Sequence, residues 1–113
     1  MSAVYVSNLI INTGATFSQS FDLLNSDSSG PLDLDGFTVA SQFRKHAGSS
    51  TKTDFTTAIT DAANGQISIS LTSTQTAAIS KPGRYVYDVV IDSGTVKTRV
   101  IEGSVLVREG VTK

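Results

Sequence analysis

The chain has 113 residues and carries 9 Lys and Arg against 10 Asp and Glu, which leaves a formal net charge of −1. This balance gives no electrostatic reason to bind nucleic acid or an anionic membrane. The lack of cysteine excludes disulfides and thiolate metal sites, and a single histidine excludes any site built on two imidazoles. Valine and isoleucine number 19 against 7 leucines, and these β-branched side chains favour strands. We therefore expect one all-β domain spanning residues 1–113.

An apolar run and two segments of alternating apolar and polar residues predict three strands in the first half of the chain. Residues 4–11 are extended and apolar on both parities, the segment 15–24 alternates cleanly, and a third strand covers 37–45. Turn-forming residues fill NSDSSGP at 25–31, and a polar loop, HAGSSTKT, occupies 46–53. These breaks keep each predicted strand short.

The middle of the chain predicts a β-hairpin. Asn64-Gly65 is its strongest signal, because both residues tolerate positive φ. The turn joins an alternating segment at 55–59 to QISISL at 66–71, in which every second residue is apolar. We expect the two segments to pair as antiparallel strands.

A short helical turn is expected next, inside residues 72–80, with Thr72 or Ser73 as its cap. The order strand, helical turn, glycine and then Tyr85 is typical of the E–F corner of immunoglobulin-like sandwiches, where a tyrosine bonds back to the preceding backbone. The antibody cysteine would fall at Tyr87, so an aromatic ring would fill that part of the core.

Two longer strands close the chain, at 84–92 and about 95–109, and Gly103 is expected to mark a bulge or bend in the second. Short strands at this spacing favour an immunoglobulin-like antiparallel β-sandwich of seven to eight strands, with a partly closed barrel as the competing architecture. Parity predicts a core drawn from Phe17, Phe21, Leu23, Phe37, Val39, Phe43, Ile67, Ile69, Leu71, Tyr87, Val89 and Ile91.

Residues with catalytic or metal-binding chemistry are few. His46 would need a nearby serine and carboxylate to act as a general base, and nothing in the sequence fixes such a triad. Asp33 and Asp35 in DLDG match the start of a calcium loop, but the remaining ligands and the closing glutamate are missing. We expect an exposed loop histidine and an ordinary turn, and hence no enzyme, no cofactor and no metal site.

Five segments occur in an order that carries a resemblance. They are GATFSQSF at 14–21, PLDLDGFTVASQFRK at 31–45, NGQISISL at 64–71, PGRYVYDVVI at 82–91 and IEGSVLV at 101–107. Together they resemble small immunoglobulin-like β-sandwich domains of tailed-phage virion proteins. The nearest parallel is the N-terminal domain of the baseplate upper protein of lactococcal phages.

The resemblance implies a non-enzymatic structural protein of the virion, assembled in the host cytoplasm. The function that the resemblance favours is that of a tail, baseplate or fibre-attachment subunit that acts through protein–protein assembly. The alternative is a capsid head decoration or cement protein. A carbohydrate-binding module ranks lower, because the chain has no tryptophan and its Phe residues mostly occupy core parity. The implied partners are other phage structural proteins, with the chain oligomeric or repeated in the particle, and neither nucleic acid nor membrane.

The N-terminal segment gives the one candidate interaction site. Residues 4–11 are apolar on both parities, whereas a strand with one solvated face should be apolar on one parity only. An exposed apolar edge invites pairing with another chain. We therefore predict that residues 1–13 hold a first strand or interface arm and that 4–11 lie at a protein–protein interface. The alternative is a strand that switches sheets midway. The candidate residues are Val4, Tyr5, Val6, Leu9, Ile10 and Ile11.

Overall fold

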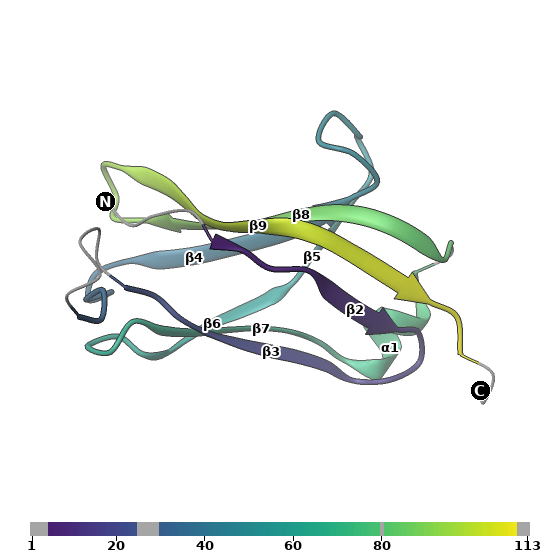
Figure 1. The fold of residues 1–113 in the computed structure, drawn as a ribbon, viewed down its shortest axis with the longest axis horizontal. Helices are drawn as coiled ribbons and strands as arrows, with labels where there is room; N and C mark the ends of the chain where they lie inside the picture. The colour runs from purple at the N-terminus through teal and green to yellow at the C-terminus, as the bar shows by residue number, and fades with distance from the viewer. Residues whose placement is uncertain (1–4, 25–29, 80, 111–113) are drawn as a thin grey trace.

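The computed structural model describes residues 5–24, 30–79 and 81–110, and it consists of two β-sheets packed face to face (Figure 1). Val4, most of the predicted turn at 25–31 and Ser80 lie outside the described residues. The larger sheet contains β1 (Tyr5–Val6), β2 (Leu9–Asn12), β4 (Thr38–Arg44), β5 (Lys52–Asp54), β8 (Gly83–Asp92) and β9 (Lys97–Arg108). The smaller sheet contains β3 (Phe17–Asp22), β6 (Thr56–Asp61) and β7 (Gln66–Leu71).

The strand order is that of an immunoglobulin-like sandwich, so the predicted fold class is confirmed. The larger sheet runs β1–β9–β8–β4–β5, with β2 also on β9, and the smaller sheet runs β3–β7–β6. Every pair is antiparallel except that β1 and β2 run parallel to β9. The N-terminal strand therefore forms one edge of the larger sheet.

The core lies between the sheets and follows the predicted parity. In β7, for example, Ile67, Ile69 and Leu71 are buried while the residues between them are not. Phe43 and Phe55 pack with their ring centroids 5.2 Å apart. All twelve predicted core residues are buried or packed against the core. The core also includes Leu9, Ile11, Leu34, Phe55, Val100, Ile101, Val105 and Val107, which the parity argument did not list.

The E–F corner is present as predicted. Helix α1 (Ser73–Ala77) begins with Thr72 as its N-cap, in a capping box with Gln75. The Tyr85 hydroxyl donates a hydrogen bond to the Lys81 carbonyl oxygen at 2.7 Å, which is the bond that defines a tyrosine corner. Tyr87 is buried, and its ring lies 6.2 Å from that of Phe55.

The bulge in β9 is not at Gly103. The register against β8 shifts between Val89 and Val90, which pair with Ile101 and Arg99 and leave Val100 as the extra residue. Because a bulge places two consecutive residues opposite one, Val100 and Ile101 both turn into the core. Gly103 pairs regularly with Tyr87 and has a different role.

Candidate functional site

The N-terminal edge of the larger sheet is one strand with a short interruption. Tyr5 and Val6 pair with Ile101 and Glu102, and after the break Leu9 pairs with Val105. The pairing offset is the same on both sides, so Ser7 and Asn8 interrupt the strand without shifting its register. The described part of the strand stays in this sheet, and the alternative in which it switches sheets is wrong.

The structure separates the six predicted interface residues. Leu9 and Ile11 are buried in the domain's own core, so they need no partner to cover them. Val6 and Ile10 point to solvent and remain 74% and 54% exposed. Tyr5 lies in β1 with its side chain outside the description, as is all of Val4. The strand is therefore apolar on both parities because one of its faces packs in the core and the other forms an exposed apolar surface.

A contact between the interruption and Gly103 holds this edge in place. The Ser7 carbonyl oxygen accepts a hydrogen bond from the Tyr87 hydroxyl at 2.6 Å, and the Ser7 amide donates to the Glu102 carbonyl at 2.9 Å. A Cβ atom at Gly103 would lie 2.1 Å from the Ser7 oxygen. Glycine is therefore required here because the backbone of the edge strand occupies the space of a side chain. Burial raises the pKa of the Tyr87 phenol above its ordinary value.

Further hydrogen bonds join the residues at both ends of β2 to β9 and α1. The Asn8 side-chain oxygen accepts from the backbone amide and the hydroxyl of Ser104, both at 3.1 Å. Beyond β2, the Thr13 amide donates to the Arg108 carbonyl at 2.9 Å. The next residue, Gly14, donates to the hydroxyl of Thr76 at 3.0 Å. The edge strand is thus fixed to β9 and to α1 and is part of the folded domain.

Exposed apolar side chains gather on the outer face beside this strand. Ile10 lies opposite the half-buried Leu106 of β9, and Val86 of β8 lies diagonally across from Leu106. We call Val6, Ile10, Leu106 and Val86 the apolar edge. Of the four large apolar residues exposed in the described part of the chain, three belong to it, and the fourth is Val96 in the β8–β9 turn. Val86 was missed because only the core parity of residues 84–92 was considered, and Leu106 was missed because no parity was assigned to 95–109.

The N-terminal edge consists of two short strands, β1 with two residues and β2 with four, but it lacks the charged side chains that usually protect an edge strand. No Asp, Glu, Lys or Arg occurs between residues 5 and 12. The opposite edge of the same sheet, β5, has three residues and carries a Lys52–Asp54 ion pair at 2.9 Å. Charged side chains discourage edge-to-edge pairing. The N-terminal edge is therefore the open one of the two.

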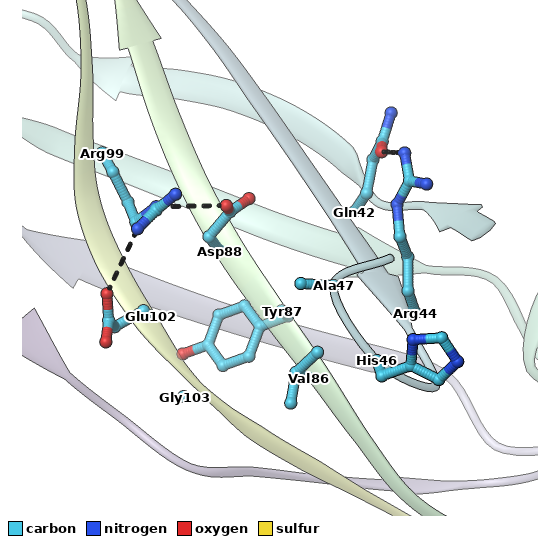
Figure 2. Close-up of a pocket in the computed structure, with 10 residues that line it drawn as sticks. All are labelled: Gln42, Arg44, His46, Ala47, Val86, Tyr87, Asp88, Arg99, Glu102 and Gly103. Atoms are coloured by element: carbon cyan, nitrogen blue, oxygen red, sulfur yellow. Dashed lines mark hydrogen bonds and ion pairs between the residues drawn. The ribbon is translucent and has the colours of Figure 1, made fainter. Parts of the chain in front are cut away.

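A hollow lined by charged and apolar side chains lies over β4, β8 and β9 on the outer face of the larger sheet (Figure 2). Arg99 bridges Asp88 at 3.3 Å and Glu102 at 3.7 Å, and Arg44 donates to Gln42 at 3.0 Å. These charges compensate one another within the sheet surface. The hollow extends from Val86 of the apolar edge to His46 and Ala47 of the β4–β5 connection.

His46 and the two aspartates of DLDG take the positions expected of them. His46 is exposed in the β4–β5 connection, and among the described residues no hydrogen bond joins its imidazole to a serine or a carboxylate. Asp33 accepts a hydrogen bond from the amide of Asp35 at 3.0 Å, as in an ordinary turn. Within the described ranges, no three metal-ligating side chains cluster and no helix is long and apolar enough to cross a membrane.

The sheet order, the tyrosine corner and the parallel first strand define an immunoglobulin-like β-sandwich. A model of the LtfC-like β-sandwich domain matches residues 4–108, and the chain belongs to this family. The match supports the coarser part of the resemblance, a phage β-sandwich domain, while the particular parallel to the baseplate upper protein remains a prediction. No curated protein matches the chain.

Proposed function

We propose that this chain is a non-enzymatic structural subunit of a phage tail, at the baseplate or a fibre attachment, that acts by binding other virion proteins. The association of its family with phage tails supports the tail over the capsid head. The proposed partners are other phage structural proteins, and the proposed location is the virion. Assembly of this kind requires a surface and no chemical step.

The observation that carries the proposal is the apolar edge. Val6 and Ile10 are exposed on a strand without charges. Leu106 of β9 lies opposite Ile10 and extends the apolar surface inward toward Val86 of β8, whereas the residue opposite Val6 is Glu102. An open apolar edge offers a partner both backbone hydrogen bonds and side-chain contacts. Its neighbours on the same strand, Leu9 and Ile11, are buried in the domain. The packing of these two residues in the core therefore fixes the exposed side chains in position before any partner binds.

Replacement of Ile10 by lysine tests this proposal, because a lysine on an edge strand blocks pairing while leaving the core parity unchanged. Val96→Lys is the matched control, since Val96 is 55% exposed against 54% for Ile10 and lies in the β8–β9 turn. Each variant would be supplied in trans to a phage lacking the gene. Its amount per purified particle would then be measured by quantitative mass spectrometry.

We expect Ile10→Lys to be folded by circular dichroism and depleted from particles at least about tenfold, as follows when an interface loses about 1.4 kcal/mol or more. Val96→Lys should be incorporated like the wild type. Equal incorporation of both variants would reject the apolar edge as the assembly surface. Gold-labelled particles in negative stain address the position, and label on the head would favour the capsid decoration alternative.

A further inference from the structure

The charges of this nearly neutral chain are separated along its long axis. One end of the sandwich gathers the β3–β4 connection, the β6–β7 turn and the β8–β9 turn (Figure 1). Five carboxylates lie there with one lysine, Lys97, which gives a formal charge of −4 among the described residues. We call this group the acidic end, and its carboxylates belong to Asp22, Asp33, Asp35, Asp61 and Asp92.

Contacts between these elements bring the carboxylates together. Asp22 ends β3 and Asp61 ends β6, the two strands that flank β7, and both residues pair with Gln66 of β7. The Leu34 amide, between Asp33 and Asp35, donates to the Ala62 carbonyl at 2.8 Å. Asp92 ends β8 opposite the first residue of β4. The acidic end is therefore one surface built by three connections that are distant in sequence.

The opposite end is basic. There β8 begins and β9 ends, and the β4–β5 connection projects from the sheet on the same half of the domain (Figure 1). Six cations accompany two carboxylates, Asp54 and Glu109, for a formal charge of +4 among the described residues. We call this group the basic end, and its cations belong to Arg44, Lys45, Lys52, Lys81, Arg84 and Arg108. The Lys45 Nζ atom lies 5.0 Å from the ring centroid of Tyr85. Because the Tyr85 hydroxyl donates a hydrogen bond to the Lys81 carbonyl oxygen, the tyrosine corner brings Lys45 and Lys81 to the same ring.

Distance keeps the two ends from neutralising each other within one copy. The domain is 44 Å long, whereas salt screens charges beyond about 8 Å at physiological ionic strength. Each end therefore presents its own charge to a neighbour. Because the net charge is only −1, overall repulsion between copies is weak. A second copy is the partner in which both complementary surfaces necessarily occur together.

We infer that copies of this chain bind head to tail, with the acidic end of one against the basic end of the next. Such a contact is heterologous, so it propagates into a row or closes into a ring. An end measures at most 27 by 22 Å, about 600 Å², which is below the roughly 800 Å² per partner of a stable complex. The contact is therefore weak for a single pair and suited to copies already repeated in an assembly. It uses neither the apolar edge nor the proposed function.

Small-angle X-ray scattering on the purified protein, in a concentration series at low and at high salt, tests this inference. Lowering the salt from about 1 M to about 0.01 M lengthens the screening distance from about 3 to about 30 Å. We expect association at low salt, with a maximum dimension near twice the 44 Å of one copy, and its loss at high salt. Association that persists at high salt, or that widens the particle without lengthening it, would overturn the inference.

Paired variants identify the surfaces. Asp33→Asn with Asp35→Asn weakens the acidic end and preserves the turn, because an asparagine oxygen also accepts the amide hydrogen bond made by Asp33. Lys81→Gln with Arg84→Gln weakens the basic end. Each should reduce the association constant about two- to thirtyfold at low salt, the range that two exposed ion pairs supply.

Two comparisons exclude misfolding, and the change in net charge alone, as the cause of a weaker association. A mixture of the two variants should associate more than either alone, because each retains the end that the other lacks. Ser18→Lys with Ser20→Lys changes the net charge as the aspartate pair does, on the exposed middle of β3, and should not weaken association comparably. A mixture no better than its components, or an equal loss in the serine pair, would contradict the inference.

Discussion

Substitution of Gly103 by alanine tests how the edge strand is attached. The new Cβ atom would lie 2.1 Å from the carbonyl oxygen and 2.8 Å from the carbonyl carbon of Ser7, so the edge strand must move away from β9. That shift breaks the 2.6 Å hydrogen bond from Tyr87, worth about 1 kcal/mol. Overpacking against backbone costs about 1–3 kcal/mol more. We expect the free energy of unfolding to fall by about 2–4 kcal/mol.

Urea unfolding followed by circular dichroism measures this change, and Gly48→Ala is the matched control. A Cβ atom at Gly48 meets its nearest neighbour, His46 Nδ1, at 3.7 Å, which is ordinary contact. The control should therefore change stability by less than about 1 kcal/mol. A Gly103→Ala protein within about 0.5 kcal/mol of the wild type would refute the attachment of the edge strand over Gly103.

Two further substitutions test the parity of the edge strand and the buried phenol. Ile11→Ala should cost about 2–5 kcal/mol of unfolding free energy because Ile11 is fully buried, whereas Ile10→Ala should cost less than about 1 kcal/mol; equal losses in urea unfolding would contradict the assigned parity. Tyr87→Phe should cost about 0.5–1.5 kcal/mol at neutral pH by losing the bond to Ser7. Because burial raises the folded-state pKa of Tyr87, its neutral phenol adds stability that is complete below the unfolded pKa of about 10 and is lost as the pH rises through the folded value. The wild type should therefore lose stability above about pH 10 more steeply than Tyr87→Phe, and parallel pH profiles would contradict this cause.

Local pattern was enough to predict most of the sandwich. The alternation in QISISL determines which side chains of β7 are buried, because successive residues of a strand face opposite sides. Asn64-Gly65 forms a tight turn in which Gly65 has a φ of 66°. A Cβ atom there would also meet the Leu23 carbonyl at 2.5 Å. The alternation and the turn depend on residues that are close together in the sequence, whereas the approach of Leu23 to Gly65 is a tertiary contact.

The N-terminal edge could not be resolved in the same way. Its partner β9 lies about 96 positions further along the chain, as in the pair of Tyr5 with Ile101. The sequence around Ser7 gives no sign that its carbonyl lies where Gly103 lacks a side chain. The sequence predicts Gly103 to be an irregularity of its own strand, whereas in the structure it accommodates a different strand. Only the tertiary pairing distinguishes these two roles of a glycine.

The separation of charge could also not be predicted from the sequence. The carboxylates of the acidic end occur singly or in pairs, each beside a turn. Asp92, for example, accepts a hydrogen bond from the Gly94 amide, as is common in turns. The topology then brings alternate connections to the same end of the sandwich. Composition reports a net charge of −1, which conceals two ends of opposite sign.

Site-specific photo-crosslinking in intact particles tests most directly whether the apolar edge is the assembly surface. A photoreactive amino acid would replace Ile10 in one protein and Val96 in another, two positions of nearly equal exposure. After irradiation of purified virions, mass spectrometry would identify the crosslinked chains. The account predicts a crosslink from position 10 to another virion protein and little or none from position 96. Crosslinks from position 96 alone, or none from position 10 in particles that contain the protein, would contradict it.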